Sequence, residues 1–325
     1  MECCPTELWL KIAGLACTDG GRTGCALSLV SREMRALVGP VRFTSISLTT
    51  EEQLHAFSAL LSSPGTDSSP TIRHLLVYLE TQAEHGSDLD TSSIDSALCH
   101  VLSVAAPTVV TLAVHGIRFD LIPPRLPFPS LHDLSIDSTD YSTSLTSPHF
   151  TTTRRLHIVR RTFPPHPDFW PDLTRFTPLL THLRLSCVAR DGSVPRFLRI
   201  LLDVPVLAPS GPMGATDAYA PGSEHARRAA ETAARLPALR RVAVQPLLMR
   251  VRGMCGTPRI AHGRMLVALD AVARACAEGR GTGTLCVLPG SPSYRVDEAR
   301  ADWVNAVGGG DGAWRAVGAK CGAAE

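Results

Sequence analysis

The segment "VVTLAV" at residues 109–114 is one copy of a short pattern that recurs along this chain of 325 residues. The pattern is an apolar residue, two variable residues, a leucine or valine, one variable residue and a second apolar residue. Because successive side chains of a strand point to opposite faces, each copy predicts a short β-strand with its apolar positions on one face. The other copies are "IRHLLV" (72–77), "LHDLSI" (131–136), "LTHLRL" (180–185) and "LRRVAV" (239–244), with weaker ones in "TRRLHI" (153–158) and "GTLCVL" (283–288).

The spacing of the copies favours a repeat architecture. The central leucines Leu112, Leu134 and Leu156 follow one another at 22-residue intervals, which is typical of leucine-rich repeats built from a strand and a return segment. The asparagine expected after the last apolar position is absent from every copy, so we predict an irregular solenoid. Residues with a helical pattern fill the wider intervals, at 92–105, 194–204, 223–236 and 262–279, and a further helical pattern precedes the first copy, at 49–61.

An ordinary α/β domain is the alternative to a solenoid. The strands of a doubly wound sheet are buried on both faces and therefore consist of nearly continuous apolar runs. The strands predicted here carry polar residues between their apolar positions, such as Arg155, His157 and Arg184. This alternation predicts one buried face and one face open to solvent, and it favours the solenoid.

The first segment of the chain, "PTELWLKIAGLA" at residues 5–16, predicts a short helix with a large apolar surface. Leu8, Ile12 and Leu15 form one apolar stripe, and a second predicted helix follows at residues 25–39 after a polar, glycine-containing loop. About forty residues of short helices cannot bury all their apolar groups among themselves. These helices therefore either pack on the rest of the chain or reserve part of their surface for a partner.

These two segments resemble the F-box of fungal F-box proteins. The resemblance rests on Pro-x-Glu-Leu-Trp with an isoleucine four residues after the leucine, then Leu-Val-Ser-Arg, and then Phe43 at the start of a strand. F-boxes dock on the Skp adaptor of SCF-type cullin–RING ubiquitin ligases. Cys4 stands where the family usually has leucine, which predicts a weaker contact there. The resemblance implies that the adaptor-binding residues are Pro5, Leu8, Trp9, Ile12, Leu29, Val30 and Ser31.

The predicted open face of the strands is the candidate substrate-binding surface. It carries His115 on one strand and Asp133, Ser135 and Asp137 on the next, and the three strands that follow each present arginine. A guanidinium group can make two hydrogen bonds to one oxyanion, so we expect this face to bind a protein with an acidic or phosphorylated patch. The residues assigned to substrate binding are Arg155, His157, Arg184 and Arg241.

No known catalytic or metal-binding motif is present in the sequence. A nucleophile elbow, a P-loop, an HExxH motif and the kinase motifs are all missing. "GRGTGTLC" at residues 279–286 precedes a strand, so it lacks the context of a dinucleotide-binding loop. The ten cysteines form no CxxC pair. We therefore expect no enzymatic activity, no metal and no cofactor.

Composition and charge exclude several other classes. The net charge is only +2, which gives no case for nucleic-acid binding. The most apolar stretch, residues 101–114, is interrupted by polar residues and proline and is too short for a membrane span. The first residues lack the basic region of a secretory signal. These features predict no membrane partner and an intracellular location, either cytoplasmic or nuclear.

Taken together, the sequence predicts an α/β protein with an N-terminal F-box-like helical module followed by an irregular leucine-rich-repeat-like solenoid. Residues 1–45 are the predicted adaptor-docking module, 46–290 the substrate-binding region, and 291–325 a C-terminal helix with a glycine-rich tail. The expected function is that of the substrate-recognition subunit of an SCF-type E3 ubiquitin ligase. Two alternatives are a protein-interaction scaffold without a ligase link, and an enzyme on an unrecognised α/β fold with a pocket of convergent ionisable groups.

Overall fold

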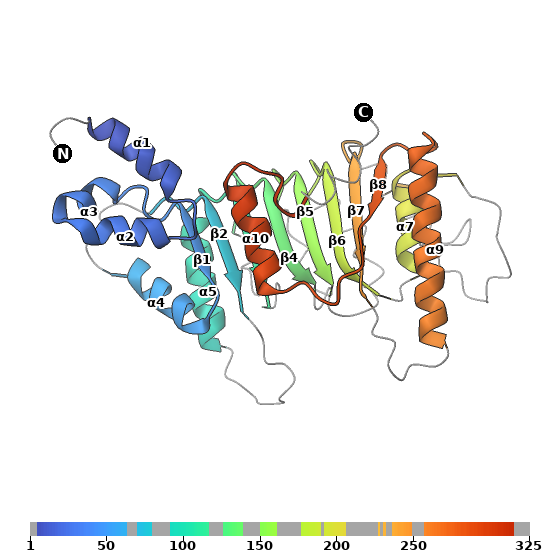
Figure 1. Ribbon diagram of the computed structural model, residues 1–325, viewed down its shortest axis with the longest axis horizontal. Helices are drawn as coiled ribbons and strands as arrows, with labels where there is room; N and C mark the ends of the chain where they lie inside the picture. Colours follow the sequence, from blue (N-terminus) through green and yellow to red (C-terminus); the bar gives the residue numbers. More distant parts are fainter. Residues whose placement is uncertain are drawn as a thin grey trace. The chain divides into compact units, whose positions relative to one another are not determined.

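The computed structural model describes residues 5–63, 70–79, 92–116, 126–138, 150–160, 177–189, 192–205, 236–248 and 257–314, together with residues 227, 230 and 231. Eight strands form one sheet whose order follows the sequence, and every pairing seen between described residues is parallel (Figure 1). The strands are β1 (Ser45–Leu48), β2 (His74–Tyr78), β3 (Thr111–His115), β4 (Asp133–Ser138), β5 (Arg155–Arg160), β6 (His182–Val188), β7 (Arg241–Pro246) and β8 (Thr284–Val287).

This architecture corrects the predicted fold. An F-box-like helical module followed by an irregular leucine-rich-repeat-like solenoid is wrong, because the structure is an all-parallel eight-stranded sheet with helices between its strands. The strands themselves are where the repeated pattern puts them, since each of the seven copies overlaps a strand from β2 to β8. The pattern therefore identified the strands correctly but not the fold that they build.

The error came from the polar residues between the apolar positions. A solenoid with one open face requires those residues to be solvated, but all five residues of β3 and every residue of β6 from Leu183 to Val188 are buried. Polar side chains can be buried at low cost when they are hydrogen-bonded, and several of these are bonded to one another. The strands thus have the double burial expected of the α/β alternative.

The chain divides into two compact units, which are described separately. Unit 1 comprises Met1–Asp137 and Arg295–Arg315, and unit 2 comprises Ser138–Tyr294 and Ala316–Glu325. The division into three parts, with boundaries near residues 45 and 290, stays a prediction. None of the helices in the described part of the chain has the length and apolarity needed to cross a bilayer.

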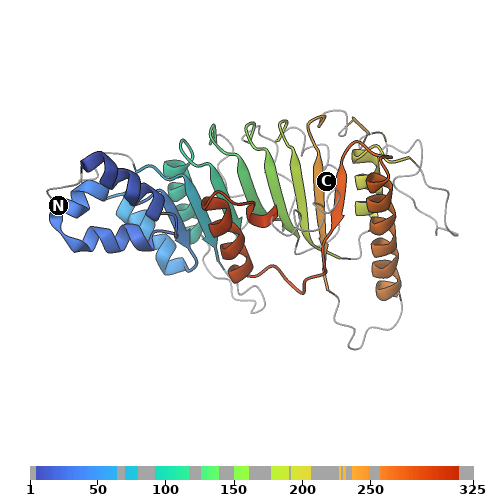
Figure 2. The ribbon, with the colours of Figure 1, turned by 45° about the horizontal axis from the view of Figure 1, so that its top comes forward.

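The sheet of unit 1 is organised around one row of leucines. Leu75, Leu112 and Leu134 occupy the same register position on β2, β3 and β4, and all three are buried. Between the strands run α4 (Glu51–Leu61) and α5 (Ser92–Ala105), which pack against each other. They lie on the same face because both crossovers step to the next strand in the same direction with the same hand. The opposite face of β2 and β3 is covered by α10 (Val296–Val307), which the short helix η3 (Gly312–Trp314) follows (Figures 1 and 2).

Three helices precede β1 in unit 1: α1 (Thr6–Ala16), α2 (Arg22–Val30) and α3 (Arg32–Val38). The single helix predicted over residues 25–39 is wrong, because the chain is extended at Ser31 and separates α2 from α3. The Ser31 hydroxyl accepts a hydrogen bond from the Met34 amide at 3.0 Å and so caps α3. Arg35 Nε donates to the Ser28 carbonyl at 2.9 Å and satisfies an acceptor near the end of α2.

Unit 2 repeats the same arrangement. Its central positions Leu156, Leu183, Val242 and Leu285 are paired in register across β5, β6, β7 and β8 and are buried. The helices α7 (Ser193–Leu201) and α9 (Thr257–Ala277) pack side by side, and α9 contacts β8. The helix predicted at 223–236 lies mostly outside the described residues, and so does the tail beyond residue 314.

A histidine at the start of β2 makes the stability of the protein pH-dependent. Burial, and then the neighbouring charge of Arg73, lower the pKa of His74 from 6.5 to about 4, and its Nδ1 is a buried nitrogen with no hydrogen-bond partner. The unfolded chain therefore takes up a proton below about pH 6.5 that the folded chain resists until about pH 4, so stability falls as the pH falls through this range.

We expect His74→Gln to flatten the pH dependence of the denaturation midpoint between pH 4 and 7. The matched control is His55→Gln, since His55 is exposed on α4 and should leave the profile of the parent chain unchanged. Urea denaturation at several pH values measures both. Parallel profiles for the parent chain and His74→Gln would contradict the assignment.

Candidate functional site

One side of α1 is packed inside the helical segment of unit 1. Ala13 is 3% exposed and lies in a cluster with Met34 and Val38, and the indole of Trp9 is half-buried against the same cluster. This contact fixes which way α1 is turned, because positions four apart lie on one face of a helix. The stripe that contains Trp9 and Ala13 is therefore the inner one.

The other stripe of α1 faces outward, and α2 ends in two further exposed aliphatic residues. The five side chains together are here named the apolar helical surface. They are large and aliphatic, and more than half of each side chain's residue surface is exposed: Leu8 51%, Ile12 53%, Leu15 72%, Leu29 77% and Val30 66%. Figure 2 shows the helices that carry them, α1 and α2. Large aliphatic side chains that a protein leaves exposed are candidates for contact with a partner.

Local sequence holds α2 in the position that exposes Leu29 and Val30. Gly24 is buried, and a Cβ at this position would collide with the backbone of Arg42, so α2 can approach this segment only through a glycine. At the other end, the extended backbone of Ser31 stops the helix directly after Val30. Leu29 and Val30 thus stand at the last turn of a short helix with no following turn to cover them.

The seven predicted adaptor-binding residues divide into two groups. Trp9 and Ser31 are half-buried, and their roles in the structure are packing and capping. Leu15 was missing from the prediction although it is more exposed than Leu8 or Ile12. Its place three residues after Ile12 on the same stripe was the signal that could have added it. The exposed group consists of Pro5, Leu8, Ile12, Leu29 and Val30.

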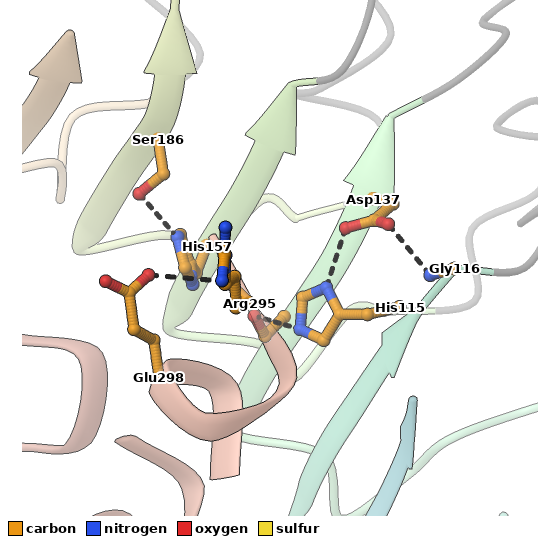
Figure 3. A network of polar contacts seen from close by, with 8 residues as sticks. His115, Gly116, Asp137, His157, Ser186, Arg295 and Glu298 are labelled. Carbon is orange, nitrogen blue, oxygen red and sulfur yellow. Dashed lines mark hydrogen bonds and ion pairs between the residues drawn. The ribbon is translucent and has the colours of Figure 1, made fainter. Parts of the chain in front are cut away.

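The four residues predicted to bind substrate all lie in unit 2, and two of them are not accessible. His157 is 2% exposed and Arg184 is 5% exposed, so the expectation that they face solvent is wrong. A dashed line in Figure 3 joins the His157 ring to the Ser186 hydroxyl. His157 Nε2 is 2.8 Å from Ser186 Oγ, and Arg184 Nη2 donates to Gln245 Oε1 at 2.9 Å. The hydrogen-bond partners stand on neighbouring strands, which explains how these polar side chains can be buried.

The other two predicted residues, Arg155 and Arg241, are half-buried and belong to a basic row at the start of the strands. Arg155 pairs in register with His182, and His182 pairs in register with Arg241, so the three side chains leave the same face of β5, β6 and β7. At a strand spacing of about 4.8 Å, the two arginine backbones are roughly 10 Å apart. Two guanidinium groups at this separation can contact neighbouring carboxylates or phosphates of one extended segment.

Among the described residues no group of three or more histidine, cysteine, aspartate or glutamate side chains is arranged to hold a metal ion. Comparison with protein-family models found no family that matches the chain, and comparison with curated proteins found no match either. The assignment of a function therefore depends on the geometry of the chain itself.

The difference between the two sides of α1 leads to a stability prediction. Leu8→Asp should change the free energy of unfolding by less than about 0.5 kcal/mol, because the side chain is exposed. Ala13→Asp on the same helix puts a carboxylate into the packed cluster and should cost about 3 kcal/mol or more. Chemical denaturation measures both, and an equal loss in the two variants would show that Leu8 is part of the core.

The polar cluster of unit 2 gives a second stability prediction. Arg184→Ala removes a charged donor from Ser186 and Gln245 and should destabilise the protein by about 2–3 kcal/mol. Arg155→Ala, at a half-buried position on the neighbouring strand, should cost less than half as much. Thermal melts of the two variants compare them directly, and equal melting temperatures would contradict the structural role of Arg184.

Proposed function

We propose that this protein is the substrate-recognition subunit of an SCF-type E3 ubiquitin ligase and docks on a Skp-type adaptor through α1 and α2. The observation that carries the proposal is the apolar helical surface. Four of its five members, Leu8, Ile12, Leu29 and Val30, stand at positions to which the F-box resemblance assigns adaptor contact, and they are exposed. Leu15 extends the same stripe by one turn of α1.

The free-energy argument supports a partner at this surface. Removing one large aliphatic side chain from water is worth about 1.5–3 kcal/mol, so leaving five of them exposed forgoes a large stabilisation. If α1 and α2 served only the fold, polar residues would be expected on their solvent-facing sides. Buried on an adaptor, the same side chains would form the apolar centre of an interface, where most binding free energy is concentrated.

The strands of unit 2 supply the candidate surface for the substrate. With His157 and Arg184 buried, the predicted contacts narrow to Arg155 and Arg241, joined by His182 between them. This basic row suits a substrate with an acidic or phosphorylated segment. The ligase chemistry would take place on other subunits, inside the cell, and this chain would act by raising the local concentration of the substrate.

The test is a pull-down of the full-length protein with a purified Skp adaptor. We expect Leu8→Asp/Ile12→Asp to lower binding at least about tenfold, because each change leaves a carboxylate against an apolar partner surface. The matched control is Ile260→Asp/Val267→Asp, which makes the same kind of change on the exposed aliphatic residues of α9 in unit 2. This control variant should bind as well as the parent chain.

Two results would overturn the proposal. If the intact protein does not bind the adaptor, a protein-interaction scaffold without a ligase link becomes the better description. If both double variants bind as tightly as the parent chain, the adaptor contacts a different surface from the one on α1 and α2.

A further inference from the structure

A buried histidine, a buried aspartate and a half-buried serine of unit 1 form a connected polar chain that the docking function does not use. His115 ends β3, and Asp137 lies on β4, next to it in the sheet. Figure 3 shows the imidazole of His115 directed at the carboxylate of Asp137. His115 Nδ1 is 2.8 Å from Asp137 Oδ1, and His115 Nε2 is 3.0 Å from Ser135 Oγ. Each ring nitrogen thus has a partner of a different chemical kind.

The aspartate is fixed in place by the backbone. Asp137 Oδ2 accepts a hydrogen bond from the Gly116 amide at 2.8 Å. Gly116 has φ +74°, and a Cβ there would collide with the carbonyl of Leu79, so only glycine fits this turn. With one oxygen held by the amide and the other by the imidazole, the carboxylate is confined to a single orientation, and it is only 2% exposed.

This arrangement determines the tautomer of a neutral His115. An ionised carboxylate can only accept, so the ring proton is on Nδ1, facing Asp137. Nε2 then carries the lone pair and accepts the hydrogen bond from the Ser135 hydroxyl. A serine whose proton points to a histidine that is itself oriented by a buried carboxylate is the arrangement of an activated nucleophile.

In unit 2, the serine that contacts a histidine, Ser186, has a different set of hydrogen bonds. Ser186 Oγ donates to Gln245 Oε1 at 3.0 Å and accepts from Arg184 Nε at 3.2 Å, so its proton is directed away from His157. Ser186 is also fully buried, whereas Ser135 is half-buried and keeps contact with solvent. Of the two serines, Ser135 is the one that combines a contact to a histidine ring nitrogen with partial exposure to solvent.

We propose that Ser135, His115 and Asp137 form a catalytic triad that hydrolyses small carboxylic esters. Ser135 Oγ bonds to the ester carbonyl carbon while its proton passes to His115 Nε2, and Asp137 holds the resulting imidazolium. The imidazolium gives the proton to the leaving oxygen, which departs as an alcohol. A water molecule then attacks the acyl-serine, its proton passes through His115, and Ser135 and a carboxylic acid are released. Ser135 and His115 are the catalytic residues, and Asp137 is a positioning residue.

The test is labelling of the full-length protein with a fluorophosphonate probe, followed by mass spectrometry to locate the adduct and by hydrolysis of p-nitrophenyl acetate. We expect an adduct on Ser135, none at that position in Ser135→Ala, and unchanged labelling in the matched control Ser186→Ala. Asp137→Asn should label about a hundredfold more slowly, because the side-chain amide of asparagine, unlike the carboxylate, does not fix the tautomer of His115.

Circular dichroism and thermal melts establish that each variant is folded. Since the adduct is sought first on the unmodified chain, the proposal does not depend on any variant folding. Absence of an adduct on Ser135 overturns it. Labelling of folded Asp137→Asn at the rate of the parent chain also overturns it, because a structural aspartate would leave the reactivity of the serine unchanged.

Discussion

The register of the parallel strands is the constraint on which the rest of the structure depends. In unit 1 it aligns Leu75, Leu112 and Leu134, and in unit 2 it aligns Leu156, Leu183, Val242 and Leu285, so that each sheet segment presents one continuous apolar row. A shift by one residue would turn each of these side chains to the opposite face. Truncating one of them to alanine would cost about 2–5 kcal/mol, a large part of the stability of a typical domain.

The same register decides which polar residues meet. His115 and Asp137 come together because β3 and β4 are aligned at Leu112 and Leu134, and Arg184 meets Gln245 because β6 and β7 are aligned at Leu183 and Val242. Between Ser186 and Val188 the pairing is irregular, and Cys187 has a φ of 60°. Such bulges redirect side chains at the end of a strand. The register that aligns the apolar rows thus also brings together the members of both polar clusters.

The sequence predicted the strands well because their signal is local. A leucine flanked by apolar residues at the right spacing marks a strand whatever its neighbours are, and the helical pattern at 92–105 coincides with α5. The break at Ser31 was missed because an amphipathic pattern continues through it, while the capping bond to Met34 depends on a backbone conformation that the pattern does not encode. The prediction of the fold was wrong because the side chains of the adjacent strand decide whether a polar residue on a strand is buried or solvated. Arg184 and His157 were predicted to be solvated because their hydrogen-bond partners, Gln245 and Ser186, lie 61 and 29 residues further along the chain.

For the docking surface, the sequence located the apolar stripe of Leu8, Ile12 and Leu15 on α1 but could not tell whether it faces outward. The cluster of Ala13, Met34 and Val38 resolves this, because it engages Trp9 and leaves Leu8 and Ile12 in solvent. The most direct test of the central claim, that this exposed surface is an adaptor interface, is calorimetric titration of the chain with a Skp adaptor at several temperatures. The account predicts binding with a clearly negative heat-capacity change, the mark of apolar burial. No binding at any temperature, or a heat-capacity change near zero, would contradict it.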